Sequence, residues 1–261
     1  MGKNSLLVCG ESFASQYSLG DEMIWPNDYI NKIIHGDCLE IMRNIPDESI
    51  DAIITDPPYG ISFKSTRQTY QGDIKNDSLE EWQKILPSFL IEFKRVISPR
   101  GCCCCCCCGG GKTPVTAIFT MEAIKHFNLI QTLVWRKFVG IGWKYRPAYE
   151  NIVILSKTAT EYSWYDTSKN MANVIENINQ DIPTNKWQHP TQKPVRLMEL
   201  LIKNHTKPGD MVLDPFCGSG TTCEAAKKLG RKYIGIEIES RYIEMAERRL
   251  AQDYLFTQNN P

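Results

Sequence analysis

The sequence predicts a single α/β domain, because strand-like runs alternate with helical ones along its 261 residues. The clearest unit is the apolar run 211–213, which closes on Asp214 and is followed by small residues and the helix-like segment 221–230. A second apolar run, 50–55, leads into the turn 56–59. Each is typical of a strand that ends in a special turn.

The other elements follow from apolar periodicity and turn residues taken along the chain. Apolar residues recur every three or four positions over 79–96, which predicts an amphipathic helix with a core-facing stripe. Residues 98–101 are expected to form a turn, and 156–188 are polar with little periodicity. Further strands are expected at 29–37, 102–108, 129–135, 149–155 and 231–237, and further helices at 38–42, 114–126, 195–202 and 241–251.

The turn after Asp214 has the composition of a nucleotide-type site. Gly218 and Gly220 allow the backbone to approach a ligand closely, while the free N–H groups of the next helix point into the same space. Glu237 closes the following strand, about 17 residues after Gly220 (237 − 220), where an acid can accept hydrogen bonds from ribose hydroxyls. A simple strand-to-helix turn is the alternative for the glycines taken alone.

The turn Asp56-Pro57-Pro58-Tyr59 has a different chemistry. Two prolines remove two N–H donors, so the Asp56 carboxylate and nearby carbonyls form an acceptor-rich cleft beside an aromatic ring. Such a cleft suits the exocyclic amine of a flat base. The alternative is a proline turn with an incidental tyrosine.

Together these motifs resemble the S-adenosylmethionine-dependent amino-methyltransferases of DNA. Asp-Pro-Pro-Tyr follows one apolar strand, Asp-Pro-Phe-Cys-Gly-Ser-Gly begins 158 residues later (214 − 56), and His-Pro-Thr-Gln-Lys-Pro at 189–194 lies between them. This order is similar to that of the permuted beta group, and the resemblance covers about residues 31–250. It implies a Rossmann-like methyltransferase fold with a mostly parallel seven-stranded sheet and helices on both faces.

Missing periodicity and several turn formers predict an extension at 1–28, and polar composition predicts a tail at 252–261. Between them one methyltransferase domain is expected at 29–251, with DNA-contact loops at about 60–77 and 136–188. The 60–77 loop either closes on DNA or is a mobile surface loop. The implied catalytic residues are Asp56, Pro57, Pro58 and Tyr59. The implied S-adenosylmethionine-binding residues are Asp37, Lys193, Asp214, Phe216, Gly218, Ser219, Gly220 and Glu237.

Individual roles follow from the family pattern. Asp214 is expected near the α-amino group of the cofactor, Lys193 near its carboxylate and Glu237 on its ribose. Asp37 is expected near the adenine amine, and its position also fits a helix N-cap; the two roles can coexist. The segment 146–150 loosely matches a family pattern that borders the target-base pocket.

The implied reaction is methyl transfer to the N6 amine of adenine in double-stranded DNA. Asp56 favours adenine, because cytosine-N4 members of the family more often have Ser at that position. Cytosine N4 is the alternative within the class, and RNA or protein glutamine is a more remote one. A non-enzymatic DNA-binding regulator is the alternative of another class. A cognate restriction endonuclease is a candidate partner, and the chain is expected to be a monomer or homodimer.

Charge restricts how DNA could be bound. With 30 basic and 30 acidic residues the net charge is zero, so contacts with DNA must come from local patches. Basic and aromatic residues mix with glycines at 136–146, which suits phosphates and bases, although a solvated hairpin tip has the same composition. The candidate DNA contacts are Lys64, Arg67, Arg136, Lys137, Lys144 and Arg146.

Seven of the eleven cysteines are consecutive, Cys102 to Cys108. Consecutive residues of a strand point to opposite faces, which disfavours both disulfides within the run and one tetrahedral metal ion. A buried central strand is favoured over a metal site, and no metal is expected. No apolar run approaches the roughly 20 residues of a membrane span, and the N-terminus lacks a signal peptide's apolar core, so a cytoplasmic protein is expected.

Overall fold

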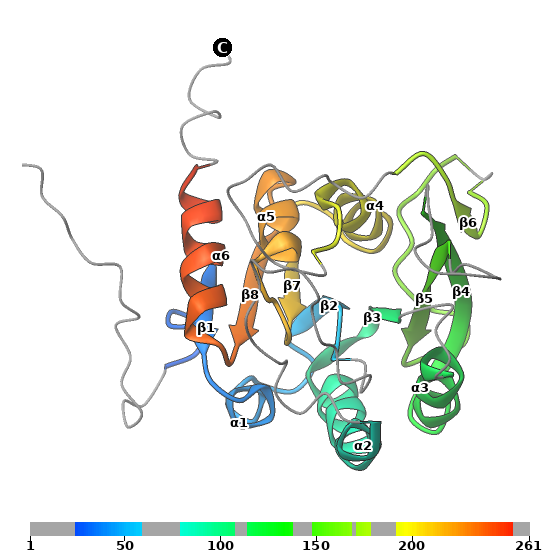
Figure 1. Ribbon diagram of the computed structural model, residues 1–261, viewed down its shortest axis with the longest axis horizontal. Coiled ribbons are helices and arrows are strands. Elements are labelled where there is room, and N and C mark those ends of the chain that lie inside the picture. Colours follow the sequence, from blue (N-terminus) through cyan, green and yellow to red (C-terminus); the bar gives the residue numbers. More distant parts are fainter. Residues whose placement is uncertain are drawn as a thin grey trace, which may run out of the picture.

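The computed structural model describes residues 24–58, 79–107, 114–137, 148–168, 171–178 and 192–252. They form an eight-stranded sheet with helices on both faces (Figure 1). The strands are β1 (Lys32–His35), β2 (Ile50–Thr55), β3 (Ile97–Cys107), β4 (Asn128–Arg136), β5 (Tyr149–Ser156), β6 (Val174–Ile175), β7 (Met211–Asp214) and β8 (Lys232–Glu237). The helices are α1 (Cys38–Met42), α2 (Leu79–Val96), α3 (Val115–Ala123), α4 (Val195–His205), α5 (Thr221–Lys228) and α6 (Ser240–Gln252).

The strand order is β1-β8-β7-β2-β3-β5-β4-β6. The first five are parallel to one another, β5 runs antiparallel to both β3 and β4, and β6 is parallel to β4. The mostly parallel sheet is therefore confirmed, with one strand more than the seven expected. That strand is β6, whose two residues are too few to show a periodicity in the sequence.

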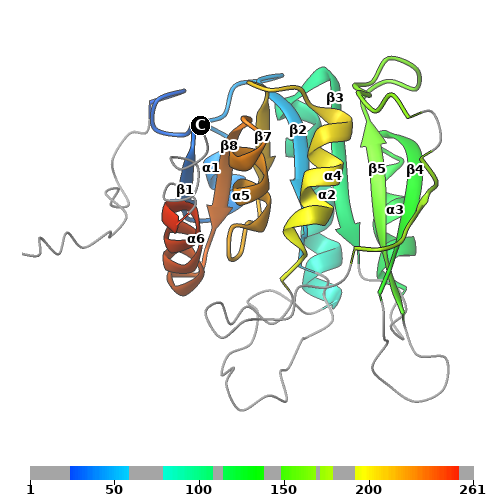
Figure 2. The ribbon, with the colours of Figure 1, turned by 90° about the horizontal axis from the view of Figure 1, so that it is seen from above.

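The two faces of the sheet carry separate cores. Ile53 of β2 belongs to the core that α1, α2 and α3 cover, whereas Ala52 and Ile54 point to the core beneath α4 and α5. Figure 2 shows α4 and α5 along one face, with α6 beside α5 at the β1 end. Burial on both sides explains why four of the six residues of β2 are apolar and why they do not alternate with polar ones.

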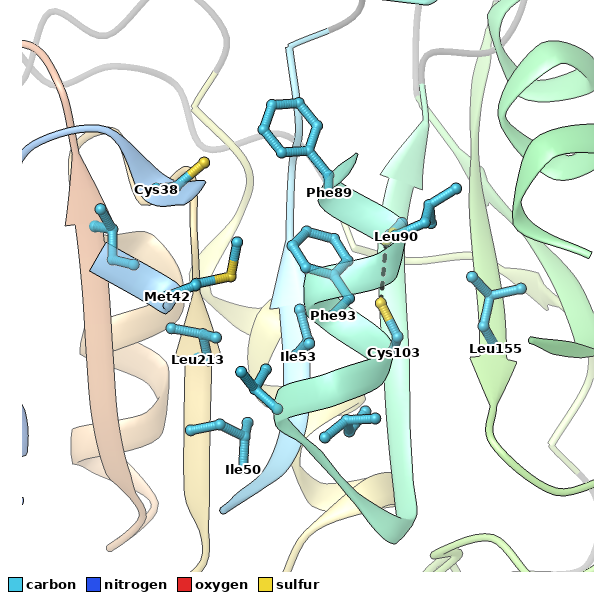
Figure 3. Close-up of a cluster of buried hydrophobic side chains, with 14 of the residues drawn as sticks. Cys38, Met42, Ile50, Ile53, Phe89, Leu90, Phe93, Cys103, Leu155 and Leu213 are labelled. Carbon is cyan, nitrogen blue, oxygen red and sulfur yellow. Dashed lines mark hydrogen bonds between the residues drawn. The ribbon is translucent and has the colours of Figure 1, made fainter. Parts of the chain in front are cut away.

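Helix α2 has the apolar stripe that its spacing predicts. Phe89, Leu90 and Phe93 are buried and face β2 and β3. They belong to the same core cluster as Ile53 and Cys103 (Figure 3). The acidic residues of its first turn and the basic residues of its last turn complement the helix dipole. This packing fixes one face of the strand that carries Asp56.

The described part of the cysteine run lies in a buried central strand, as expected, and Cys108 falls outside the described residues. Cys102 to Cys106 are all buried, with Cys103 and Cys105 on one face and Cys104 and Cys106 on the other. The thiols of Cys103 and Cys105 lie 3.3 Å apart. Burial raises the pKa of Cys102 to about 12, so this sulfur stays a thiol and is a poor metal ligand.

The predicted turn at 98–101 is wrong, because these residues belong to β3. Ile50 pairs with Ile97 and Ala52 pairs with Cys102, so a two-residue step on β2 faces a five-residue step on β3. The extra residues form an irregularity inside the strand. A Cβ at Gly101 would lie 2.7 Å from the carbonyl oxygen of Asp51, which explains the glycine.

Candidate active site

Four carboxylates lie at the carboxyl ends of neighbouring strands. Asp214 ends β7, Glu237 ends β8, Asp37 follows β1 by two residues, and Asp56 follows β2 directly. These strands are parallel neighbours, so their carboxyl ends meet at one edge of the sheet. β7 and β2 are neighbours in the sheet. From β7 the chain continues to β8 on one side, and from β2 it continues to β3 on the opposite side. Such a reversal of strand order is where open α/β sheets bind ligands.

The turn between β7 and α5 depends on its two glycines. Gly218 has φ +50° and Gly220 has φ +77°, both in the left-handed region that side chains disfavour. A Cβ on Gly220 would lie 2.8 Å from the Cβ of Ala246, so this glycine also lets α6 pack against the turn. The N–H of Cys217 donates to the carbonyl of Ile236 over 3.0 Å, which ties the turn to β8.

Asp214 is a buried carboxylate with only 4% of its surface exposed. Its Oδ1 accepts a 2.7 Å hydrogen bond from the hydroxyl of Thr55 and a 3.2 Å bond from the N–H of Phe216. Burial raises the pKa of Asp214 to about 6, against the opposing effect of hydrogen bonds from Thr55 and Thr222. A buried carboxylate of this kind gains from a cationic ligand such as an ammonium group.

Glu237 faces the same turn from the end of β8. Its Oε2 accepts from the N–H of Gly218 and its Oε1 from the N–H of Glu239, both over 2.8 Å. Burial raises the pKa of Glu237, while these backbone donors act in the opposite direction. A carboxylate has about four acceptor positions, so both oxygens retain capacity for the hydroxyls of a sugar.

Asp37 is the N-cap of α1, which confirms one of its two expected roles. Its Oδ1 accepts from the N–H groups of Leu39 and Glu40, over 2.9 and 3.2 Å. Capping and ligand binding use different acceptor positions of one carboxylate. The expected contact with an adenine amine stays a prediction.

Asp56 is part of a chain of four alternating charges. The ammonium of Lys193 lies 2.5 Å from Asp56 Oδ2 and 3.3 Å from Glu150 Oε2. Glu150 Oε1 in turn accepts from the ammonium of Lys137. Lys193 was expected beside a cofactor carboxylate; the structure places it between these two acids.

Glu150 was not among the predicted site residues, although the segment 146–150 was expected to border the target-base pocket. Only 9% of its side chain is exposed, and it carries a charge into β5 beside a run of buried apolar residues. Burial would raise the pKa of Glu150, but Lys193 and Lys137 outweigh burial and hold this pKa below its ordinary value. The sequence signal that could have identified Glu150 as a site residue is that it is the one charged residue of the mostly apolar strand β5.

The remaining predicted residues divide into two groups. Pro57 is buried and Pro58 half-buried after β2, Ser219 is buried in the glycine turn, and Phe216 packs edge-on against Phe89 with ring centroids 5.0 Å apart. Five predicted residues lie outside the described part of the chain: Tyr59, Lys64, Arg67, Lys144 and Arg146.

Arg136 and Lys137 lie where β4 ends, close to the start of β5 that carries Glu150. The side chain of Arg136 is 68% exposed and forms a 2.8 Å ion pair with Glu176. Lys137 instead directs its ammonium to Glu150. Their expected contacts with DNA stay predictions.

Metal-binding clusters and membrane-spanning helices are both absent from the described residues. No group of three or more His, Cys, Asp or Glu side chains in that part of the chain is arranged to hold a metal ion. None of the helices seen there combines the length and the apolar character that crossing a membrane requires.

Sequence comparison places this site in a known context. Residues 50–248 match the family model described as DNA methylase, for the N6 and N4 enzymes. The chain is 32% identical to the type II methyltransferase M.HinfI of Haemophilus influenzae, over 87% of this chain and 70% of the relative. It is 33% identical to the DNA adenine methyltransferase YhdJ of Escherichia coli strain K12, over 84% of this chain and 82% of the relative.

Structural comparison agrees. The fold is similar to the crystal structure of the M1.HpyAVI–SAM complex, with a TM-score of 0.65 and 28% identity over 84% of this chain and 98% of that chain. The strand-end carboxylates, the glycine turn and the Asp-Pro-Pro segment therefore lie in a fold and sequence pattern shared with DNA methylases. The chain belongs to the S-adenosylmethionine-dependent DNA methyltransferases of the N6-adenine and N4-cytosine family.

Proposed function

We propose that the protein is a site-specific DNA adenine-N6 methyltransferase. One observation carries the proposal: β2, which Asp56 follows directly, is hydrogen-bonded to β7, the strand that leads into the glycine turn. Thr55, the residue before Asp56, donates its hydroxyl to Asp214 at the start of that turn. An acceptor for an amine and a cradle for a methyl donor therefore lie side by side.

The residues at the turn fit S-adenosylmethionine. Asp214 offers a buried negative charge to the α-ammonium group, and Glu237 offers acceptor capacity to the ribose hydroxyls. The left-handed glycines Gly218 and Gly220 keep side chains away from the ligand. When bound, S-adenosylmethionine supplies a methyl group on a positively charged sulfur.

Asp56 would prepare the amine for transfer. The amino nitrogen of adenine is a poor nucleophile, because its lone pair is delocalised into the ring. The Asp56 carboxylate and the Pro57 carbonyl accept its two N–H groups, which localises the lone pair and aims it at the methyl carbon. Transfer of the methyl group to the nitrogen would leave the electron pair of the carbon–sulfur bond on sulfur, and the methylated amine held by Asp56 and Pro57 would release one proton to water.

The target base must leave the DNA helix to reach this site. Flipping a base costs a few kcal/mol, which stacking and phosphate contacts can offset. Tyr59 is the proposed stacking partner. The proposed phosphate contacts are Lys64, Arg67, Arg136, Lys144 and Arg146. Lys137 is proposed to join them by exchanging its ion pair with Glu150 for a DNA phosphate.

Adenine is favoured over cytosine by two observations. Position 56 is Asp, whereas the cytosine-N4 members more often have Ser, and the E. coli relative is named a DNA adenine methyltransferase. Cytosine N4 is the competing assignment, because the matching family includes both chemistries.

Transfer of labelled methyl from S-adenosylmethionine to unmethylated DNA, followed by nucleoside digestion and chromatography, tests the proposal. Label should appear in N6-methyladenosine with the native chain. Asp56→Ala should abolish transfer while retaining cofactor binding, whereas Glu244→Ala, which alters an exposed acid of α6, should leave transfer unchanged. Label in N4-methylcytosine would replace the adenine assignment. Transfer that survives in folded Asp56→Ala would reject the proposed role of Asp56.

The cellular setting is proposed on the same basis. The relative from H. influenzae is named a type II methyltransferase, which suggests a restriction endonuclease of the same site specificity as a partner. Double-stranded DNA as substrate favours action in the cytoplasm. A monomer or homodimer is proposed.

A further inference from the structure

A buried lysine lies against the carboxylate that is proposed to accept the target amine. Lys193 is only 7% exposed and reaches Asp56 at 2.5 Å and Glu150 at 3.3 Å. The three residues come from different places in the sequence: the end of β2, the start of β5 and the residue before the N-cap of α4. The contact therefore exists only in the folded chain and at the proposed reaction centre.

Stability alone does not explain this arrangement. Replacing a buried ion pair by apolar side chains often leaves stability unchanged or raises it, so such a pair is weak evidence of a structural role. Several other ion pairs of the described residues lie at the surface, such as Lys84 with Glu80, whereas the pair of Arg249 with Glu224 is also buried but joins two helices away from Asp56. A buried ammonium is costly unless its partners are well placed, and here both partners are acids.

We propose that Lys193 and Glu150 are positioning residues for Asp56: Lys193 holds the carboxylate ionised and oriented, and Glu150 holds Lys193 and offsets its charge. This inference rests on the proposed function of Asp56. A carboxylate accepts several donors, so an ammonium contact and an amine contact are compatible.

The role of Glu150 follows from the charge that develops in the reaction. The amine nitrogen becomes positive as it gains the methyl group, and a lysine beside it would oppose that charge if left uncompensated. Glu150 and Lys137 complete a set of two acids and two ammonium groups, so the cluster is neutral before the substrate enters.

Other charged or titratable groups also act on Asp56. Asp214 on β7 is close enough for the two carboxylates to repel each other, and the thiol of Cys105 on β3 is near as well. Repulsion from Asp214 favours protonation of Asp56. Lys193 is the cation that counters this effect directly.

The competing assignment, drawn from the family pattern, is that Lys193 binds the cofactor carboxylate. Lys193→Met separates the two when kcat, the S-adenosylmethionine dissociation constant and the rate–pH profile are all measured. If Lys193 positions Asp56, kcat at saturating cofactor should fall about 100-fold, as for other misplaced reacting groups. Calorimetric cofactor affinity should stay unchanged, and the acid limb of the profile should move to higher pH.

Two further variants provide controls. Lys193→Arg retains a cation and should restore part of kcat and return the acid limb toward its native position. Lys203→Met removes an exposed lysine of α4 and should change neither quantity. Weaker cofactor binding with a native kcat at saturation would overturn the inference and assign Lys193 to the cofactor.

Glu150→Gln tests the second half of the inference without changing side-chain shape. As a single substitution it should lower kcat. The double variant with Lys193→Met should have the same kcat as Lys193→Met alone, because Glu150 acts through the lysine. Glu48→Gln, in the pair with Lys157, is the matched control and should leave kcat native. Independent, additive losses from the two substitutions would refute the linked role.

Different results would reject the positioning role and the proposed function. A native chain that methylates DNA, loses activity in Asp56→Ala and keeps full activity with an unshifted pH profile in Lys193→Met rejects only the positioning role. A native chain that transfers no methyl to DNA rejects the proposed function itself. Circular dichroism of each variant confirms that folded proteins are being compared.

Discussion

The hydroxyl of Thr55 donates a 2.7 Å hydrogen bond to Oδ1 of Asp214, across 159 positions of sequence. It joins the ends of β2 and β7, the strands that carry the Asp-Pro-Pro segment and the glycine turn. Both residues are buried, so the bond forms away from competing water. This contact helps to fix the placement of Asp56, the proposed amine acceptor, relative to the glycine turn, the proposed cofactor site.

Thr55→Val should weaken both stability and cofactor binding. Valine keeps the shape of threonine but removes the donor, which leaves a buried acceptor of Asp214 with one hydrogen bond fewer. The expected loss in free energy of unfolding is about 1–3 kcal/mol. Urea denaturation measures the stability, and calorimetry with S-adenosylmethionine measures the affinity. Native values for both would show that the bond contributes nothing.

The raised pKa of Asp214 predicts a particular pH dependence. The folded pKa of about 6 exceeds the ordinary 3.8, so the folded state binds this proton more tightly than the unfolded state does. The contribution of Asp214 to stability is therefore lost as pH rises from about 4 to 6, by about 3 kcal/mol at most. Asp214→Asn should remove this fall from the stability–pH curve. A curve that keeps the same slope in the variant would contradict the assignment.

Cofactor affinity should change with pH in the opposite direction. The proposed contact with an ammonium group needs ionised Asp214, so affinity should decrease as pH falls below about 6. Calorimetric titrations from roughly neutral pH down to about one unit below that pKa measure this decrease. Asp214→Asn should bind more weakly at neutral pH, with little change across that range. A native chain whose affinity stays constant over the same range would place the ammonium group elsewhere.

Two glycines with left-handed backbones should respond differently to alanine. Gly230 has φ +70° with nothing within 4 Å of the position that a Cβ would take, so Gly230→Ala should cost about 1–2 kcal/mol from the backbone alone. Gly220→Ala carries a similar cost plus a clash with Ala246 at 2.8 Å, which should add about 1–3 kcal/mol. Thermal unfolding of the two variants gives the difference. Equal losses would mean that α6 moves away freely.

Arg136→Ala should separate DNA binding from stability. Arg136 forms an ion pair with Glu176, and the two side chains are 68% and 52% exposed. Losing this pair should change the free energy of unfolding by less than about 1 kcal/mol. If Arg136 contacts a phosphate, affinity for DNA should fall and the salt dependence should weaken by about one unit of slope. Lys84→Ala, in an exposed pair on α2, is the control. Unchanged binding at every salt concentration would exclude Arg136 from the DNA interface.

Local sequence determined the elements and the chemistry at their ends. Period-two and helical patterns are set by neighbouring residues, so α1 and α2 have the expected bounds and the cysteine run is a buried strand. Asp37, Asp56, Asp214 and Glu237 each follow or end a strand, and parallel strands bring their carboxyl ends to one edge. The acids of the family motifs therefore meet at one edge of the sheet, and their roles there stay predictions.

Tertiary structure decided what local patterns do not encode. The irregularity at 98–101 depends on pairing with β2, and β6 exists because two residues meet the edge of β4. The partners of Lys193 depend on three segments that meet only after folding, and a long flexible side chain can reach several acids. Glu150 stood in a loosely matching segment, and only its burial between two lysines showed which charges it holds. Sequence specifies such charges, whereas their pairing depends on which surfaces the fold brings together.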